Sequence, residues 1–461
     1  LGTGGDFTIN GSPTVLNTGT EYEDGYGEGG LVWTKIRTIT DSHYFWDTER
    51  GVNKRLSSNQ PYGENNETNA LNSFNSNGFT LGSQVGINGS AADWGSAADY
   101  ASWTFRKAPK FFTMVTWSGT GNENNTINHD LGSVPGMIIV KRINSSANWI
   151  VYHRGVNGGT NPEQYNLQLD NSNPQDQNSS YFSNTAPTET TFKVGSLNSA
   201  SGGTYVAYLF AHNDGDGGFG PDGDADIIKC GSYAGNESNF PTIDLGFEPQ
   251  FILLKSATSG EEWHLIDTMR GWLVDGNNTS GDYKYLRANA ANNEGGGFGI
   301  NVTSTGFELT SANAHANSNG NTFIYMAIRR PTKVPESGTE VFDAEQGGSS
   351  VADNALGVTT GFPVDMFMHF DNYTSGGENF VVDRLRGSRA QVRTQYSNAE
   401  AFYSTNNPSL DSNTGLINRS GSTQNLSGGF YWQWKRAPKF CDVVAYSGNS
   451  ITSTAINHNL G

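Results

Sequence analysis

The sequence predicts an all-β protein built of tandem antiparallel β-sandwich modules, jelly-roll-like in arrangement, with very little helix. Short runs of β-branched and aromatic residues are separated by Gly, Asn, Asp, Ser and Pro along the whole chain, and these are strand and turn signals. No stretch carries Ala, Leu, Glu and Lys at the heptad spacing of long helices. One apolar face of each strand needs a cover, and a second sheet provides it.

The composition argues against several classes of protein. The chain has 461 residues with 28 Lys plus Arg and 45 Asp plus Glu, which gives a net charge of −17. A nucleic-acid-binding protein normally carries a basic face, so no nucleic acid is expected as a partner. No apolar run reaches the length of a membrane span, so no membrane insertion is expected. Aromatic residues make up 12% of the chain, which predicts a sizeable folded core.

Internal repeats are the strongest signal in the sequence. The block FRKAPKFFTMVTWSG at 105–119 returns as WKRAPKFCDVVAYSG at 434–448, and TINHDLG at 126–132 returns as AINHNLG at 455–461. Between them, one plan recurs: an opening strand, a loop, a second strand, a turn with an Arg-Gly pair, and a closing aromatic strand. The second strands are expected at 31–37, 137–142, 251–256 and 366–371, the paired arginines are Arg50, Arg154, Arg270 and Arg386, and the closing strands are expected at 100–107, 205–212, 323–330 and 430–436.

The repeat has a period of about 110 residues, which is the size of a whole domain. Short joints containing Pro, such as KAPK at 107–110, predict an extended and semi-rigid string of domains. Residues 440–461 resemble the start of another copy, which predicts that the chain is an excerpt of a longer protein. The expected modules are 1–109, 110–225, 226–339 and 340–439, followed by the opening strand and loop of an incomplete module at 440–461.

The sequence offers no convergent catalytic set, so the protein is expected not to be an enzyme. The eight His are scattered, and no hydrolase, metalloprotease or phosphate-binding motif appears. His129 and His458 recur because their loops recur, and a turn histidine bonded to the backbone is the favoured interpretation over a ligand or base. The pattern D-x-x-R-G, in DTERG, DTMRG and DRLRG, favours a structural corner. Cys230 and Cys441 are expected to be unpaired thiols.

One acidic stretch, at 212–227, is a candidate calcium site. Asp222, Asp224 and Asp226 alternate like the first ligands of a calcium loop, although Ile227 and Tyr233 stand where that loop needs Gly and Glu. The alternative is a solvated linker between domains. No cofactor is expected apart from this possible calcium ion.

Exposed aromatic side chains would suit sugar ligands, because their faces stack on sugar rings. Trp94, in the loop AADWGSAADY, is the exposed candidate for carbohydrate binding. The remaining candidates lie in predicted strands, where packing in the core or on a sheet is the simpler interpretation; they are Trp33, Trp103, Trp149, Trp263, Trp432 and Trp434.

The repeated blocks resemble tandem modules in virion appendage proteins of marine bacteriophages, such as those that infect cyanobacteria. The resemblance is carried by LVWTKIR, DTERG and ASWTFRKAPKFF, then by TINHDLGSVPGMIIVKR, YHRG and TYVAYLFAHND, and then by DADIIKCGSY, LGFEPQFILLK and DTMRGW. It covers nearly the whole chain and weakens in the fourth copy, where TTGFPVD replaces the LGxxP loop.

The resemblance implies a tail fibre or similar projecting fibre of the virion. Its expected partners are further copies of the chain in a homotrimer, other virion proteins, and host-surface glycans bound weakly at several sites. Two alternatives remain open at this stage: a secreted or surface carbohydrate-binding adhesin of a bacterium, and a polysaccharide depolymerase with paired carboxylates.

Overall fold

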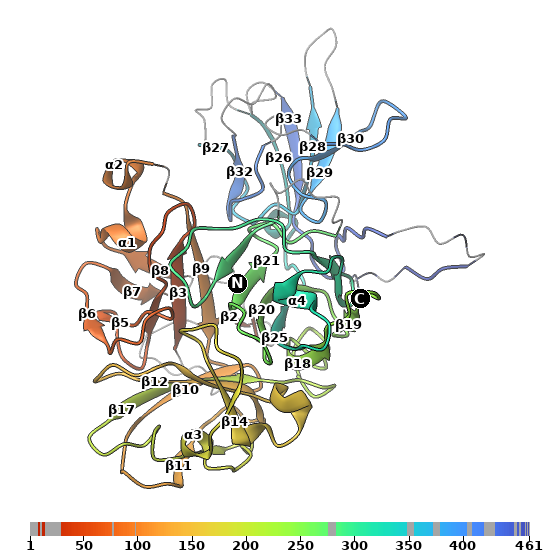
Figure 1. Ribbon diagram of the computed structural model, residues 1–461. Coiled ribbons are helices and arrows are strands. Elements are labelled where there is room, and N and C mark those ends of the chain that lie inside the picture. The colour runs from red at the N-terminus through yellow and green to blue at the C-terminus, as the bar shows by residue number, and fades with distance from the viewer. Residues whose placement is uncertain are drawn as a thin grey trace.

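A computed structural model of the chain shows four β-modules, of which three lie against one another while the fourth stands to one side (Figure 1). We name the modules 1 to 4 by their main sheets, in chain order. The structure describes residues 8–9, 12–13, 29–75, 78–96, 98–274, 283–347, 355–371, 379–402, 408–418, 429–446, 450, 453–456, 458 and 460.

Modules 2, 3 and 4 each have one larger antiparallel sheet and one smaller one, and module 1 has a larger sheet with two small pairs, β5-β6 and β7-β8. In module 1 the larger sheet has the order β4-β3-β9. The strands are β3 (Gly30–Ile36), β4 (Tyr44–Asp47), β5 (Lys54–Arg55), β6 (Asn65–Asn66), β7 (Leu71–Asn75), β8 (Gly78–Leu81) and β9 (Tyr100–Arg106), preceded in the chain by the pair β1 (Thr8–Ile9) and β2 (Ser12–Pro13).

Modules 2 and 3 repeat this plan with the orders β10-β17-β12-β13-β14-β15 and β18-β25-β20-β21-β22. Module 2 contains β10 (Phe112–Ser118), β11 (Asn125–Asn128), β12 (Pro135–Arg142), β13 (Ile150–His153), β14 (Tyr165–Gln168), β15 (Asp176–Gln177), β16 (Thr191–Val194) and β17 (Thr204–Ala211). Module 3 contains β18 (Ile228–Ala234), β19 (Thr242–Asp244), β20 (Pro249–Ser256), β21 (His264–Asp267), β22 (Tyr285–Arg287), β23 (Ile300–Thr303), β24 (Gly306–Leu309) and β25 (Thr322–Arg329).

Module 4 has the order β26-β33-β28-β29-β30-β31 in its larger sheet. Its strands are β26 (Phe342–Gln346), β27 (Leu356–Thr359), β28 (Met366–Phe370), β29 (Phe380–Asp383), β30 (Ala390–Arg393), β31 (Ala401–Phe402), β32 (Gly415–Ile417) and β33 (Phe430–Trp434). The described residues of the predicted incomplete module at 440–461 form no strand.

Helices are confined to single turns in the described residues, so the predicted all-β fold with very little helix is confirmed. They are α1 (Val85–Asn88), α2 (Ala91–Trp94), α3 (Ser179–Phe182) and α4 (Ala314–Asn317), with 3₁₀ turns η1 (Val156–Gly159), η2 (Pro162–Gln164) and η3 (Gly338–Glu340).

The main sheet of module 3 is buried on both faces. Ile252 and Leu254 of β20 point to a core shared with the small sheet of the same module. Phe251 and Leu253, on the opposite face of the same strand, lie in a second core that also contains residues of modules 1 and 2. Strands covered on both faces are apolar at consecutive positions, and the run FILL has that pattern.

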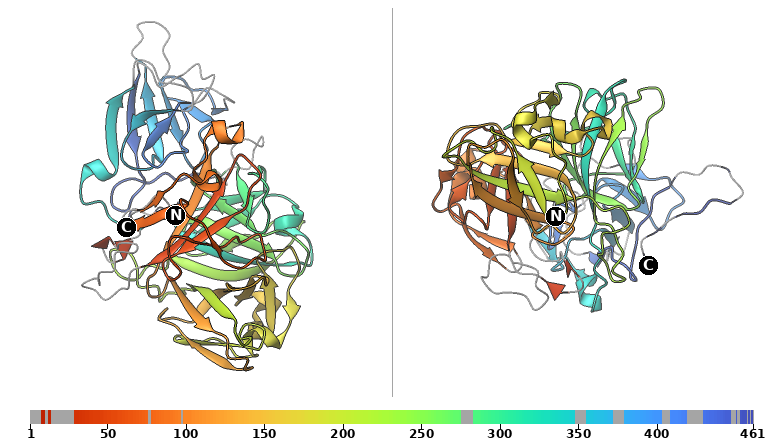
Figure 2. Two further views of the ribbon diagram at one scale, coloured as in Figure 1. Left: turned by 90° about the vertical axis from the view of Figure 1, so that its left-hand side faces the viewer. Right: turned by 90° about the horizontal axis from the view of Figure 1, so that it is seen from below.

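The outer faces of modules 1, 2 and 3 therefore form one common core. Phe105 of module 1 lies at its centre, with its ring centroid 5.4 Å from that of Phe210 in module 2 and 6.0 Å from that of Phe251 in module 3. Two further views show the three modules in contact (Figure 2). For these three modules the predicted extended string is wrong, because each sheet has a second apolar face that only its neighbours cover. We call this assembly the ring.

The ring closes through the same main-chain hydrogen bond at each of its three joints. A loop residue of one module donates its N–H to the carbonyl just beyond the second strand of the next module. The bonds run from Glu64 to Ile143 (2.6 Å), from Gln175 to Ala257 (2.7 Å) and from Glu294 to Arg37 (2.7 Å). Because each module gives to one neighbour and receives from the other, the ring has a threefold pseudosymmetry.

The D-x-x-R-G pattern forms a buried corner, as the sequence predicts. Arg50 Nε lies 2.6 Å from Asp47 Oδ2, and the main-chain N–H of Arg50 donates to Asp47 Oδ1. Gly51 leaves the turn at a φ of 96°, a conformation that L side chains rarely adopt. The same corner recurs in Asp267–Arg270 (2.6 Å) and Asp383–Arg386 (2.5 Å).

Arg154 does not occupy the position that its Arg-Gly pair predicts. The strand register places His153 of module 2 level with Asp47 and Asp267. Arg154 follows one residue later, where its N–H donates to Gly136 O just as that of Thr48 donates to Gly30 O. YHRG contains the Arg-Gly pair of the repeat, but Arg154 lies at the position of Thr48 and not at that of Arg50.

The corner carboxylates also bind donors from the adjacent module. Tyr208 of module 2 donates its hydroxyl to Asp47 Oδ2 of module 1 over 2.6 Å. Trp103 of module 1 donates its indole N–H to Asp267 Oδ2 of module 3 over 3.1 Å. At the third joint, His153 replaces the carboxylate and its Nε2 lies 3.0 Å from the carbonyl oxygen of Tyr325. Buried charges are thus paired both within and across the modules.

Three buried lysines occupy equivalent positions in the ring: Lys35, Lys141 and Lys255. Lys141 Nζ donates to Pro61 O of module 1 over 2.7 Å, and Lys255 Nζ donates to Ser172 O of module 2 over 3.2 Å. Burial lowers the pKa of each of the three lysines to about 8. The ammonium groups of Lys141 and Lys255 thus link loops across two joints at a cost in desolvation, whereas Lys35 Nζ donates within module 1, to Ile36 O and Ile39 O.

We predict that Tyr208→Phe lowers the free energy of unfolding by about 2 kcal/mol, because Asp47 loses a buried hydrogen bond to a charged group. Denaturant titration followed by tryptophan fluorescence measures this loss, and modules 1 to 3 are expected to unfold in one transition because they share a core. Tyr446→Phe, at a tyrosine that is 70% exposed, is the control and is expected to leave stability unchanged. A loss below about 0.5 kcal/mol for Tyr208→Phe would contradict the structural role of this bond.

The lysines predict that stability rises with pH above about pH 8. In this range the folded lysines release protons that the unfolded chain still holds up to its ordinary pKa of 10.5. Each lysine therefore adds up to about 1.4 kcal/mol per pH unit to the free energy of unfolding between pH 8 and 10.5. Lys255→Met is expected to flatten this rise, whereas Lys439→Met, at an exposed residue, leaves it unchanged. An equal slope in wild type and Lys255→Met would refute the assignment.

Candidate functional site

A polar pocket with an exposed tyrosine lies in module 1, beside its joint with module 2. It has a volume of about 250 Å³ and is formed by the loop between β5 and β6 together with residues next to β4. Tyr62 is 61% exposed at its edge. We call it the Tyr62 pocket; its lining residues are Ser42, Tyr44, Arg55, Ser57, Gln60, Tyr62, Gly63 and Asn65.

Module 2 fixes the loop that carries Tyr62. Trp149 donates its indole N–H to the carbonyl oxygens of Ser57 (2.9 Å) and Gln60 (3.1 Å). The residues on either side of Tyr62 and Gly63 are also bound, because Pro61 O accepts from Lys141 and the N–H of Glu64 donates to Ile143 O. The backbone of the pocket is therefore held in place by the ring before any ligand arrives, which limits the entropy that binding must overcome.

The pocket combines aromatic surface with hydrogen-bonding groups and little net charge. The Arg55 guanidinium lies 4.8 Å from the centre of the Tyr44 ring and pairs with Glu67 over 2.6 Å. Burial and the neighbouring Asp41 raise the pKa of Tyr44, so its hydroxyl stays protonated and donates to Asp41. Hydroxyl and amide groups of Ser, Gln and Asn complete the lining. Such a surface suits a neutral, hydroxyl-rich ligand.

Tyr62 was not among the predicted carbohydrate-binding candidates, which were all tryptophans. Counting from the equivalent Leu56, Leu167 and Leu286, the positions that match Tyr62 are Asn173 and Asn292, so the tyrosine belongs to module 1 only. An aromatic residue between Pro61 and Gly63, in a run of Asn and Gln, was the available signal.

Trp94 lies at the end of the helical turn α2 and not in a loop. It is half-buried, and its indole N–H is within hydrogen-bonding distance of Val85 O (3.2 Å) and Tyr100 Oη (3.1 Å). Its polar edge is thus used inside module 1, and Trp94 does not line the Tyr62 pocket. A carbohydrate-binding role for Trp94 stays a prediction.

The acidic stretch does not gather its carboxylates. Asp222 and Asp224 are exposed, whereas Asp226 accepts the N–H groups of Gly215 (2.8 Å) and Gly217 (3.1 Å). In the part of the chain that the structure describes, no three His, Cys, Asp or Glu side chains come together in a group suited to a metal ion. Calcium binding by Asp222, Asp224 and Asp226 stays a prediction without support from this geometry.

Two histidines accept hydrogen bonds within turns, and a third is buried in the ring. The N–H of Leu131 donates to His129 Nδ1 and that of Leu460 donates to His458 Nδ1, so the predicted turn histidines are confirmed. Burial lowers the pKa of His153 to about 3, which keeps this residue of the ring neutral. Cys230 is buried and Cys441 half-buried, and both are free thiols, as predicted.

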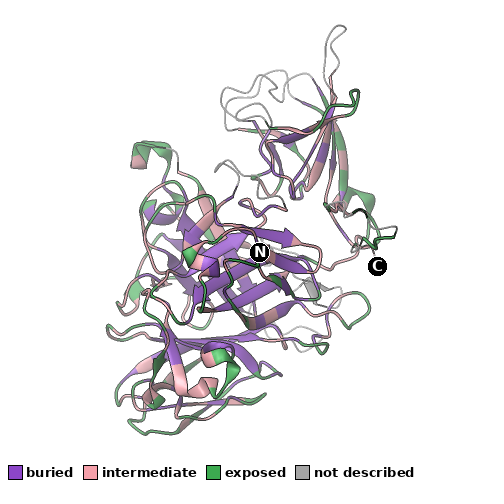
Figure 3. Cartoon of the chain, turned by 45° about the vertical axis from the view of Figure 1, so that its right-hand side comes forward, coloured by how far each residue is buried: buried purple, intermediate pink, exposed green. Residues whose placement is uncertain are grey.

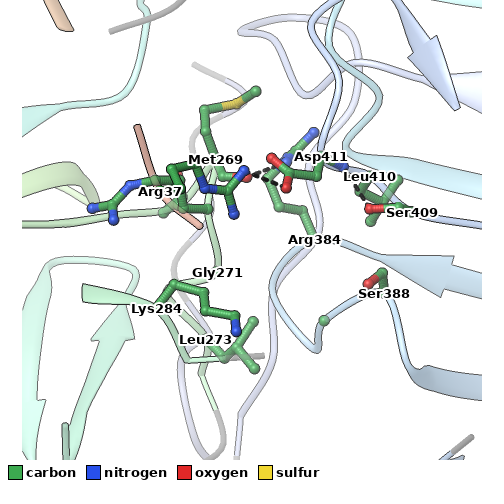
Figure 4. Close-up of a pocket in the computed structure, with 13 residues that line it drawn as sticks. Arg37, Met269, Gly271, Leu273, Lys284, Arg384, Ser388, Ser409, Leu410 and Asp411 are labelled. Carbon is green, nitrogen blue, oxygen red and sulfur yellow. Dashed lines mark hydrogen bonds and ion pairs between the residues drawn. The ribbon is translucent and has the colours of Figure 1, made fainter. Parts of the chain in front are cut away.

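A second, smaller pocket of about 80 Å³ lies between the ring and module 4 (Figure 4). Arg37 of module 1 reaches Asp411 of module 4 over 2.5 Å and Glu294 of module 3 over 3.0 Å. Arg384 of module 4 pairs with Asp365 over 2.9 Å. These guanidinium groups already have carboxylate partners, so the pocket is a joint of paired charges.

The comparisons with known proteins come to one match. A family model described as a domain of unknown function, DUF7483, matches residues 14–331. The chain belongs to the DUF7483 family. The DUF7483 segment ends just after β25, so it includes the ring and stops before module 4. No curated protein and no solved structure matches the chain. Among the described residues, no helix is long and apolar enough to cross a membrane.

Proposed function

We propose that this DUF7483 protein is a structural and adhesive part of a virion appendage of a marine bacteriophage, such as a tail fibre. In this proposal it binds hydroxyl-rich polymers of the host surface and does not transform them. The sequence resemblance supports the assignment to the virion, and its partners there are other virion proteins and host-surface glycans. The observation that carries the binding role is the exposed Tyr62 above a polar, neutral and rigidly held pocket.

The organisation of the ring supports a structural role. Its buried ionic groups serve the corners and joints between modules: Asp47 binds Arg50 and Tyr208, and Asp267 binds Arg270 and Trp103. Three sheets locked around one core make a stiff body, which suits an object that projects from a particle. Each ring contributes one pocket, so the overall affinity of an appendage rises through multivalency when it carries many copies of the chain.

The two alternatives differ in measurable ways. A bacterial adhesin with these modules would bind glycans in the same manner but would be found on cells, so detection of the protein on purified phage particles separates the two. A depolymerase would release new reducing ends from host polysaccharide, and a binding protein would not.

We predict that Tyr62→Ala weakens binding to purified host-surface polysaccharide by about tenfold, which corresponds to about 1.4 kcal/mol. The loss arises because the exposed ring is the stacking surface of the pocket. Calorimetric titration of the full chain measures it, and Tyr396→Ala, at another exposed tyrosine, is the matched control with unchanged affinity. Equal affinity of wild type and Tyr62→Ala would overturn this site, and polysaccharide cleavage by the wild type would overturn the binding-only function.

A further inference from the structure

Module 4 presents an uncovered aromatic sheet face. Alternate residues of β33 point out of the module, with Phe430 46% and Trp432 45% exposed, and Phe342 of β26 lies beside Trp434 in the same face. The opposite face packs on the small sheet of the module through Phe367 and Tyr431. Figure 3 shows the central strands of the ring as mostly buried, whereas the strands of module 4 also carry intermediate and exposed residues. A face this apolar usually marks an interaction surface.

The strand register identifies this face with the one that builds the ring. Leu31 pairs with Asp47 and Phe105 in module 1, and Met366 pairs with Asp383 and Trp434 in module 4. Trp432 is therefore the counterpart of Trp103, which is only 2% exposed. The same face is buried by neighbouring modules in modules 1 to 3, whereas in module 4 the described residues leave Phe430 and Trp432 exposed.

Module 4 also carries both polar halves of a ring joint. At two ring joints, an aromatic donor of one module binds the corner carboxylate of the adjacent module, as Trp103 binds Asp267. At the third joint the donor position is Met326 and the carboxylate position is His153, so both halves are changed together. Module 4 has the donor Trp432 and the acceptor Asp383, with Arg386 bound to Asp383 as Arg270 is bound to Asp267.

We infer that three copies of the chain associate through this face of module 4, in the arrangement that modules 1, 2 and 3 have within one chain. Trp432 of each copy donates its indole N–H to Asp383 Oδ2 of the next copy, and Arg386 lies over that indole as Arg270 lies over Trp103, 5.2 Å from Cζ to ring centre. This inference deepens the proposed function by naming the surface and the partner of self-association.

The symmetry follows from the direction of the joint. The donor and the acceptor of one module bind different neighbours. Module 1 donates a hydrogen bond from Trp103 to module 3 and accepts one at Asp47 from module 2. A contact of this kind is heterologous, and it either closes into a ring or continues into a filament. Within the chain it closes after three modules, so identical fourth modules with the same face are expected to close after three copies.

The test is the molar mass of the full chain in solution, measured by light scattering after size exclusion at tens of micromolar. Three times the mass of the single chain is expected. Trp432→Glu puts a charge into the centre of the face and is expected to give single chains with the thermal unfolding profile of modules 1 to 3 unchanged. Phe240→Glu, at an aromatic residue of module 3 that is 45% exposed, is the matched control and stays trimeric.

A single-chain or dimeric mass for the wild type overturns the inference, and so does a Trp432→Glu variant that remains trimeric. Trp432→Phe keeps an aromatic side chain but replaces the indole with a smaller phenyl and removes the N–H donor, so it is expected to raise the concentration at which trimers dissociate by about tenfold. The Tyr62 pocket lies outside this face, so polysaccharide binding by a single-chain protein would refute the trimer and leave the binding function standing. A trimer that binds no polysaccharide would refute the binding function and leave the trimer standing.

Discussion

The burial of both faces of each main sheet is the constraint on which the ring depends. One face of β20 is covered by the small sheet of module 3, and its other face is covered only by modules 1 and 2. A module with this second face open to water would expose a large apolar surface, which costs free energy in proportion to its area. The chain therefore folds modules 1 to 3 as one body, although each has the sequence of a separate domain.

Apolar faces alone would permit several relative rotations of the modules, and the polar joints select one. The indole N–H of Trp103 reaches Asp267 only when the sheets cross in the observed way, and a buried carboxylate without its donors is costly. We regard this selection as the reason why charged corners persist inside the core, where an apolar pair would be at least as stable. The third joint supports that view: His153 and Met326 differ together, so no carboxylate is left without its donor.

The sequence predicted the strands well because their residues decide them locally. The runs LVWTKIR, MIIVKR and FILLKS became β3, β12 and β20, and the D-x-x-R-G corner formed where it was expected. The short KAPK joint predicts an extended string, so the ring did not follow from the sequence. The clue was present in apolar residues at consecutive strand positions, which indicate two covered faces. The Tyr62 pocket is lined by two segments of module 1, one near Ser42 and one from Arg55 to Asn65, and contacts from module 2 hold the second segment in place. No local sequence pattern reports contacts of this kind.

The bounds of the DUF7483 match separate the three modules of the ring from module 4. The match includes the three modules that complete one another and ends before the fourth, so the segment matched by the family model coincides with the closed ring of this chain. Joining three modules in one chain makes ring closure independent of concentration and lets each joint and loop diverge, as His153 and Tyr62 have done. A module that assembles with identical copies has no such freedom, because every copy must present donor and acceptor at once. Module 4 has both Trp432 and Asp383 at these positions of one face, and that combination is what assembly between identical chains would require.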